Sequence, residues 1–103
     1  MPAAPLSRQE IEDGLGDLPG WSLEGDRIAC AYRFRDHIAA AAFVQHVVAI
    51  QNELNHHSDL TLGYNTVSLS VNTHDAGGAV TGNDLELAGR VAAIAPGHGA
   101  RQR

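Results

Sequence analysis

Two adjacent histidines, His56 and His57, lie in the stretch N-H-H-S-D at residues 55–59. A third histidine, His74, ends the run V-S-L-S-V-N-T-H. Imidazole has an unperturbed pKa of about 6.5, so both of its protonation states are available near neutrality, which suits general acid-base catalysis. Clustered imidazoles disfavour one another's protonation, so one can act as base while another acts as acid. These three residues are the candidate chemical groups of the chain.

Two predicted elements position these histidines. Apolar residues recur at helical spacing over residues 37–54, after Asp36 as N-cap, and His56 and His57 follow where this helix ends and the chain turns. Alternating apolar and polar residues on both sides of 63–65 predict a β-hairpin. If its turn is centred near Asn65, paired residues have numbers that add to about 130, which places His74 opposite His56. We therefore expect the three imidazoles to converge on one small pocket.

Other interpretations of these histidines remain open. Three histidines can also bind a catalytic zinc ion, although the sequence shows no HExxH pattern and no clear carboxylate partners, so this is the second choice after a metal-free site. Histidines near helix ends are often solvated surface residues, which suffices for His37, His46 and His98. A cysteine or serine nucleophile is disfavoured because Cys30 falls in a predicted core strand and Ser58 in a loop cap.

The rest of the chain predicts a single α+β domain. Its 103 residues are 44% hydrophobic and 18% charged, a globular composition. Ser7 with Glu10, and Thr81 with Asp84, are capping-box patterns that open the first and last helices. A first hairpin precedes residue 36, so the predicted order is α-β-β-α-β-β-α, with a four-stranded antiparallel sheet and the helices packed on one face. We expect one domain over residues 1–95 and a disordered tail over 96–103.

Charge and cysteine content restrict partners and location. The net charge of -5 argues against direct binding to nucleic acid. A single cysteine excludes an internal disulfide and fits a reducing compartment. We find neither the apolar core of a signal peptide nor a run of membrane-spanning length. A cytoplasmic protein without membrane association is expected.

Several motifs in order resemble the pterin-4a-carbinolamine dehydratase family. They are N-H-H-S-D at 55–59, Y-N-T-V at 64–67, T-H-D-A-G-G at 73–78 and T-G-N-D-L-E-L-A at 81–88, with L-P-G-W-S-L at 18–23 and Y-R-F-R-D-H at 32–37. The resemblance covers roughly residues 7–94. It implies dehydration of 4a-hydroxytetrahydropterin to quinonoid dihydropterin, which recycles the pterin cofactor of aromatic amino-acid hydroxylases.

The resemblance also implies that no metal or organic cofactor is needed and that the protein is a homodimer or homotetramer. A non-enzymatic role as a dimerisation partner or transcriptional coactivator is the alternative. Residue by residue, His56 and His74 match the family's acid-base histidines, and His57 matches the histidine that holds substrate. Asp84 matches the aspartate that opens the last helix and is expected to bind substrate, with a plain capping role as the alternative.

The sequence departs from the family pattern at a few positions. Ser58 replaces the proline that follows the histidine pair, which is expected to loosen the helix exit. Asn52 stands where many members carry a carboxylate, and Leu60 replaces an aromatic residue that could stack on the pterin. The loop before Thr81 is one residue longer than usual. We expect these changes to affect substrate affinity more than the reaction class.

Overall fold

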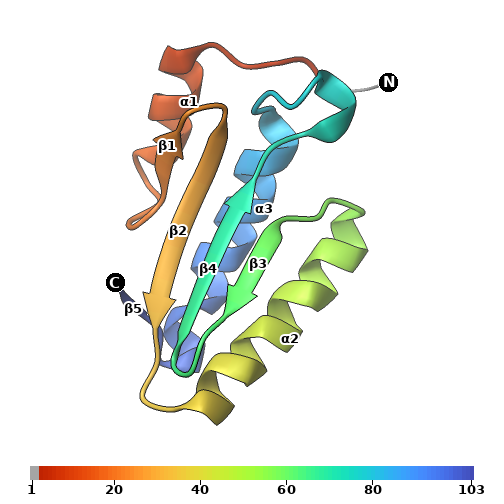
Figure 1. The fold of residues 1–103 in the computed structure, drawn as a ribbon. Coiled ribbons are helices and arrows are strands. Elements are labelled where there is room, and N and C mark those ends of the chain that lie inside the picture. Colours follow the sequence, from red (N-terminus) through yellow and green to blue (C-terminus); the bar gives the residue numbers. More distant parts are fainter. Residues whose placement is uncertain (1–2) are drawn as a thin grey trace.

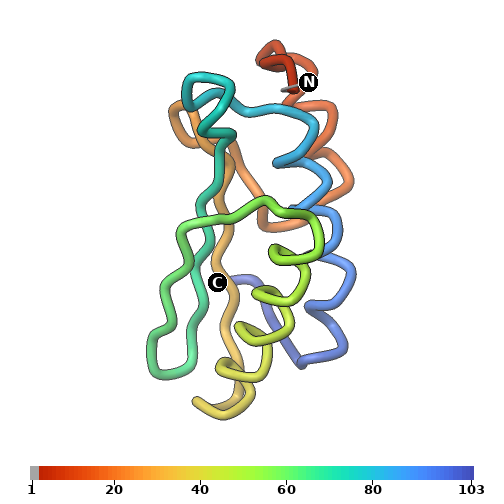
Figure 2. The backbone as a smooth tube through the Cα atoms, turned by 90° about the vertical axis from the view of Figure 1, so that its right-hand side faces the viewer, coloured from red at the N-terminus to blue at the C-terminus, as the bar shows by residue number. Residues whose placement is uncertain are grey.

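The computed structural model describes residues 3–103, which form a sheet with helices on one face (Figures 1 and 2). In chain order the elements are α1 (Arg8–Leu15), β1 (Ser22–Glu24), β2 (Arg27–Arg33), α2 (His37–Leu54), β3 (Asp59–Leu62), β4 (Thr66–Val71), the 3₁₀ turn η1 (His74–Ala76), α3 (Gly82–Ile94), the 3₁₀ turn η2 (Pro96–His98) and β5 (Arg101–Gln102). The predicted α+β class and α-β-β-α-β-β-α order are confirmed.

The strands form one antiparallel sheet in the order β1-β2-β4-β3, and β5 also pairs with β2. The central pair is β2–β4, which runs from Ile28 opposite Val71 to Arg33 opposite Thr66. Each β3–β4 pair has residue numbers that add to 129, as 59 and 70 do, one less than the sum we predicted. The β3–β4 ladder begins at Asp59, so the histidines lie just beyond its end rather than within it.

The core lies between the sheet and the two long helices. On β2 and β4 every second residue is buried, in agreement with the predicted alternation. From the helices, the fully buried apolar side chains are Ala40, Phe43, Val47, Leu87, Ala88 and Val91. Burial of one such large side chain contributes about 1.5–3 kcal/mol, so this interface is the main source of stability. It also holds the end of α2 and the start of α3 at the same end of the sheet (Figure 1).

Two ionisable groups of β2 belong to this core. Burial raises the pKa of the Cys30 thiol to about 12. Burial, followed by the neighbouring Cys30, raises the pKa of the Tyr32 phenol to about 12 as well. The Tyr32 hydroxyl accepts a hydrogen bond of 3.2 Å from Trp21 Nε1. Both groups are therefore neutral structural residues at physiological pH.

The segment 96–103, predicted to be a disordered tail, forms η2 and β5 instead. Tyr32 pairs with Gln102 and Arg33 with Arg101, and the backbone N–H of Arg103 donates to the carbonyl of Ala31 at 3.2 Å. The physical reason is an incomplete sheet edge. On this side of β2, β1 pairs only with residues 27–29, so the remaining backbone groups of β2 need another partner. Glycine permits the turn that leads into β5, since Gly99 has φ of 74°.

Candidate active site

The three histidines identified from the sequence lie in the wall of one cavity. The cavity has a volume of about 210 Å³ and lies where α2 ends and β4 runs into η1. Its lining comprises Asn55, His56, His57, Asn72, Thr73, His74 and Asp75. The predicted convergence of the imidazoles on one pocket agrees with this arrangement, although the loops beyond the β3–β4 ladder produce it.

The end of α2 directs the two adjacent histidines differently. Asn55 is the C-cap and adopts the left-handed conformation with φ of 51° and ψ of 42°, which asparagine tolerates better than most residues. The backbone N–H of His56 then donates to the carbonyl of Gln51 at 3.0 Å. The His56 side chain is 14% exposed and points to α3, while His57 is exposed. One imidazole is thus held by the protein, and its neighbour is available at the cavity surface.

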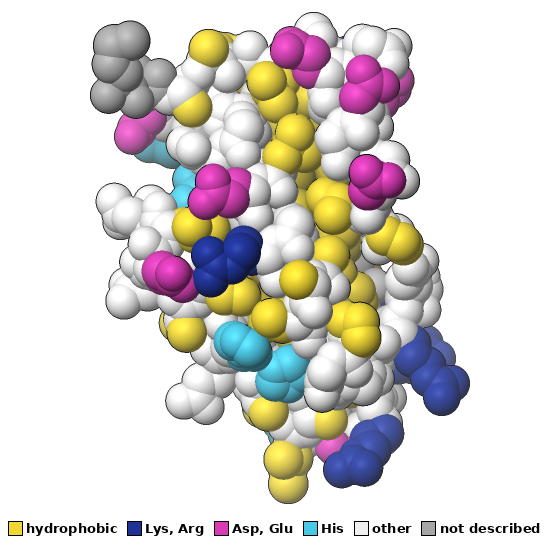
Figure 3. All heavy atoms as spheres, turned by 180° about the vertical axis from the view of Figure 1, so that it is seen from behind, with side chains coloured by type: hydrophobic (Ala, Val, Ile, Leu, Met, Phe, Trp, Pro, Cys, Tyr) yellow, Lys and Arg dark blue, Asp and Glu magenta, His cyan; other side chains and the backbone are white. Residues whose placement is uncertain are grey.

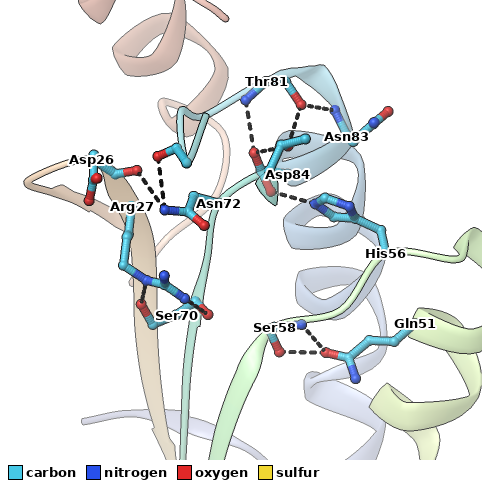
Figure 4. A network of polar contacts seen from close by, with 12 residues as sticks. Asp26, Arg27, Gln51, His56, Ser58, Ser70, Asn72, Thr81, Asn83 and Asp84 are labelled. Carbon is cyan, nitrogen blue, oxygen red and sulfur yellow. Dashed lines mark hydrogen bonds and ion pairs between the residues drawn. The ribbon is translucent and has the colours of Figure 1, made fainter. Parts of the chain in front are cut away.

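Ser58 stabilises the end of α2, whereas we expected it to loosen this end. Its backbone N–H donates to Oε1 of Gln51 at 2.9 Å, and its hydroxyl donates to the same oxygen (Figure 4). Gln51 is 5% exposed and belongs to the last turns of α2. A proline at position 58 would have no N–H for the first of these bonds. Serine at this position therefore ties the helix exit to a buried side chain through two hydrogen bonds.

A buried carboxylate from α3 holds His56. Nε2 of His56 lies 2.5 Å from Oδ1 of Asp84, whose side chain is 0% exposed (Figure 4). An ionised carboxylate only accepts hydrogen bonds, so Nε2 carries a proton and the tautomer of His56 is defined. Nδ1 is then the nitrogen at which His56 can gain or lose a proton.

The second carboxylate oxygen of Asp84 has its own partners. Oδ2 accepts from the hydroxyl of Thr73 at 2.8 Å and from the backbone N–H of Thr81 at 2.8 Å. The hydroxyl of Thr81 in turn donates to that of Thr73 at 2.7 Å, and it caps α3 by accepting from the N–H of Asn83 at 3.2 Å. The predicted capping box is present, and one residue serves both the helix start and His56.

Asp84 thus differs from its expected role in one respect. It was expected to bind substrate, but it is fully buried and is not part of the cavity lining. Its contacts are with His56, Thr73 and Thr81. Thr73 and Gln51 were not predicted as site residues, although a glutamine among the apolar residues of a core helix was an available signal.

His74 is held by a compact loop between β4 and α3. It is the exposed first residue of η1, and the loop is closed by a bridge between Thr73 and Ala79. The side chain of Asn72 donates to the carbonyl of Gly78 at 2.9 Å and ties the two ends of the loop together. The additional residue noted in this loop therefore does not displace α3, since the capping box still places Asp84 against His56.

The other departures from the family pattern lie outside the cavity lining. Leu60 is opposite Leu69 in the sheet and packs against the hydrophobic core. Asn52 is exposed on α2, and the adjacent Glu53 pairs with Arg90 at 2.8 Å. Neither Asn52 nor Leu60 contributes to the wall around the histidines.

Within residues 3–103, no three His, Cys, Asp or Glu side chains are arranged so that they could hold a metal ion. In the same part of the chain, none of the helices has both the length and the apolar character needed to cross a bilayer.

Comparison with known proteins is consistent with the resemblance. The sequence model of the family described as pterin 4 alpha carbinolamine dehydratase matches residues 4–94. Two Streptomyces proteins named "Putative pterin-4-alpha-carbinolamine dehydratase" align over 97% of this chain and 99% of their own length, with 64% identity for the S. avermitilis protein and 62% for that of S. coelicolor. A crystal structure described as a transcriptional coactivator/pterin dehydratase from Brucella melitensis superimposes with a TM-score of 0.82 and 28% identity, covering 87% of this chain and 97% of that one.

Proposed function

The chain belongs to the pterin 4 alpha carbinolamine dehydratase family, and on this premise we propose that it dehydrates a 4a-hydroxytetrahydropterin to quinonoid dihydropterin and water. The observation that carries the proposal is the fixed His56–Asp84 pair in a cavity shared with His57 and His74. Such a reaction recycles the pterin cofactor of aromatic amino-acid hydroxylases.

The proposed chemistry needs one proton donor and one proton acceptor. The C–O bond to the 4a-hydroxyl breaks, and the hydroxyl leaves as water after it receives a proton. The neighbouring ring nitrogen loses its proton, and its electron pair forms the new C=N bond. The buried carboxylate of Asp84 holds Nε2–H of His56 and leaves Nδ1 as the nitrogen that accepts this proton. His74 supplies the proton to the leaving hydroxyl from the other wall of the cavity.

The remaining predicted residues have supporting roles in this proposal. His57 is exposed in the cavity wall and binds the substrate. Asp84 fixes the tautomer and direction of His56, so it is a positioning residue rather than a substrate ligand. A positioned acid or base contributes about 10²–10⁴-fold to rate, so each of the two catalytic histidines carries a measurable share.

Histidine variants assayed with a synthetic 4a-hydroxytetrahydropterin test the assignment. We expect His56→Ala and His74→Ala to lose about 10²-fold or more in kcat, and His57→Ala mainly to raise KM. His37→Ala is the matched control, because His37 lies at the start of α2, away from the cavity. Wild-type turnover in both acid-base variants would reject the mechanism. A wild-type enzyme no faster than the spontaneous reaction would reject the function itself and favour the non-enzymatic alternative.

A chelator separates the metal-free mechanism from the zinc alternative. Activity that is unchanged after dialysis against EDTA agrees with proton transfer by the histidines alone. Activity that is lost on dialysis and restored by added zinc would favour the three-histidine metal site instead.

We also propose that the protein is a homodimer or homotetramer. Large apolar side chains are exposed on α2 and at the β3–β4 turn: Ile38 is 81%, Val48 49%, Leu62 39% and Tyr64 72% exposed. If these side chains form one contiguous patch in the folded chain, a second copy is the partner that we propose to cover it. Sedimentation at micromolar concentration tests this, and a single species with the mass of one chain would contradict it.

A further inference from the structure

We propose that a second cavity, far from the histidines, binds a small phosphate monoester. This cavity has a volume of about 680 Å³ and lies between the end of β2, the start of α2 and the C-terminal segment. Its polar lining comes from Arg33, Arg35, Arg101 and His98, with the backbone of Gly97 and Gly99 between them. Phe34 and Ala39 contribute apolar surface. The proposal does not depend on the function of the histidine cavity.

The arginines of this cavity differ from three of the other four in the chain, and the fourth, Arg103, is the last residue and also forms no ion pair with a described residue. All seven basic residues counted as Lys or Arg are arginines. Three of them pair with carboxylates at 3.1 Å or less, namely Arg8 with Glu12, Arg27 with Asp59 and Arg90 with Glu53. By contrast, Arg33 and Arg101 form no ion pair with any described residue, and Arg35 only approaches its neighbour Asp36 at 3.5 Å.

The sheet register forces two of these charges together. Arg33 of β2 lies directly opposite Arg101 of β5, so the two side chains leave the same face of the sheet at neighbouring positions. Like charges directly opposite each other destabilise a strand pair. These two positive charges lie side by side although the protein as a whole has a net charge of -5. A bound anion would remove the repulsion, because each guanidinium fork can donate two parallel hydrogen bonds to phosphate oxygens.

The same region is held in place by a histidine pair. Nδ1 of His46 on α2 lies 2.9 Å from Nε2 of His98 on η2, so one imidazole donates to the other. The ring of His98 also packs edge-on against Phe43 at 5.6 Å between centroids. These contacts fasten η2 to α2 and fix one wall of the cavity before any ligand binds.

The size and charge of the site favour a compact ligand over a long polyanion. The volume falls within the range of about 300–1,000 Å³ that is usual for small-molecule sites. In Figure 3 the dark-blue arginine side chains at the lower right are set apart from most of the magenta acidic side chains, which gather towards the top. A nucleic acid or other extended anion would meet that acidic surface, whereas a single phosphate group would not. The apolar wall leaves room for the organic part of an ester.

This cavity is independent of the histidine cavity in space. Ala39 lines the one and Asn55 the other, at opposite ends of α2. Sixteen residues of helix separate them, a rise of about 24 Å. Binding at the arginine cavity can therefore be changed without touching His56, His57 or His74.

Titration of the full-length protein with phenyl phosphate, inorganic phosphate and phenol, followed by calorimetry and amide NMR in 0.15 M NaCl, tests the proposal. We expect phenyl phosphate to bind at one site per chain with sub-millimolar affinity, with the largest amide shifts at residues 33–35 and 97–101. Phenol should not bind. If inorganic phosphate binds as tightly as the ester, the phosphate group alone is recognised and free phosphate is the ligand.

Arginine variants distinguish this site from general attraction to positive charge. Arg33→Gln and Arg101→Gln should each weaken phenyl phosphate binding about tenfold, the loss expected for one charge-assisted contact. Arg90→Gln removes a paired arginine elsewhere and should leave affinity unchanged, and unliganded thermal unfolding verifies that each variant is folded. Absence of saturable binding up to 10 mM would overturn the proposal, where 10 mM is roughly the weakest useful small-molecule affinity. Equal weakening by Arg90→Gln, or tighter binding of an octaglutamate peptide, would overturn it as well.

Discussion

Replacing Asp84 with asparagine separates the positioning of His56 from the general integrity of the fold. The two side chains have the same shape, so the packing around this fully buried residue is retained. The amide keeps one oxygen, which can continue to accept from Thr73 and from the N–H of Thr81. Its NH₂ group then takes the place of Oδ1 and faces Nε2 of His56. A donor meets a donor at this position.

The size of the effect follows from that clash. Either the bond of 2.5 Å between His56 and residue 84 is lost, or His56 moves its proton from Nε2 to Nδ1. A hydrogen bond to a charged group contributes about 1.5–3 kcal/mol, so the free energy of unfolding should fall by about 2 kcal/mol. The other tautomer cannot accept a proton at Nδ1, so kcat should fall about 10²-fold or more. KM should change little, because residue 84 does not line the cavity.

Three measurements test the Asp84→Asn variant. Steady-state rates give kcat and KM, urea unfolding gives the stability, and ¹⁵N NMR of the His56 ring gives its tautomer. Glu86→Gln is the matched control, because it neutralises an exposed carboxylate on the same helix. If Asp84→Asn keeps kcat within about twofold of the wild type while its stability falls, the carboxylate serves only the fold and the positioning argument is refuted.

Three other predictions concern the surrounding structure. A double-mutant cycle of Gln51→Leu and Ser58→Ala in urea unfolding should give a coupling energy of about 1–2 kcal/mol, whereas additive effects would mean that Ser58 does not fasten the helix exit. Because burial raises the pKa of Cys30 from 9.0 to about 12, the unfolded chain releases a proton that the folded chain keeps, so stability should fall by up to about 1.4 kcal/mol per pH unit above pH 9. Tyr32 adds to the slope only above pH 10, so Cys30→Ala should flatten the profile between pH 9 and 10, and an unchanged slope there would contradict the assignment. Deletion of residues 101–103 should lower the free energy of unfolding by about 1–3 kcal/mol through loss of the β5 hydrogen bonds, and a stability equal to that of the full chain would show that this segment does not pack.

The convergence of the three histidines was predictable because each stands next to the end of a regular element. Helical periodicity locates the end of α2, and strand alternation locates the end of β4. These local patterns suffice to place His56, His57 and His74 at the same end of the sheet. The one-residue error in register did not matter, because the three histidines reach the cavity from loops that lie beyond the β3–β4 ladder.

The pairing of His56 with Asp84 was not predictable from such patterns. A capping box accounts for an aspartate at this position by local contacts alone, and those contacts are indeed made. Whether its free oxygen reaches a histidine 28 residues away depends on how α3 packs across the sheet. The prediction of a disordered C-terminal tail was wrong for the same reason. Its composition suggests flexibility, but an unpaired stretch of β2 supplies backbone partners that sequence cannot reveal.

The buried polar residues around His56 explain why a site on loops can be rigid. His56 is restrained from two sides, by Gln51 through the helix exit and by Asp84 from α3. Within residues 3–103, every buried side-chain nitrogen or oxygen has a hydrogen-bond partner. Such a network rigidifies the site only when every member is satisfied, and removal of one member leaves another buried group unpaired. Serine at position 58 is therefore compatible with a rigid site because Gln51 offers a partner for the Ser58 N–H, a group that proline would lack. A chain with serine here and leucine at position 51 would lose both hydrogen bonds of Ser58, and only the backbone bond from His56 to residue 51 and the contact with Asp84 would then hold His56 in place.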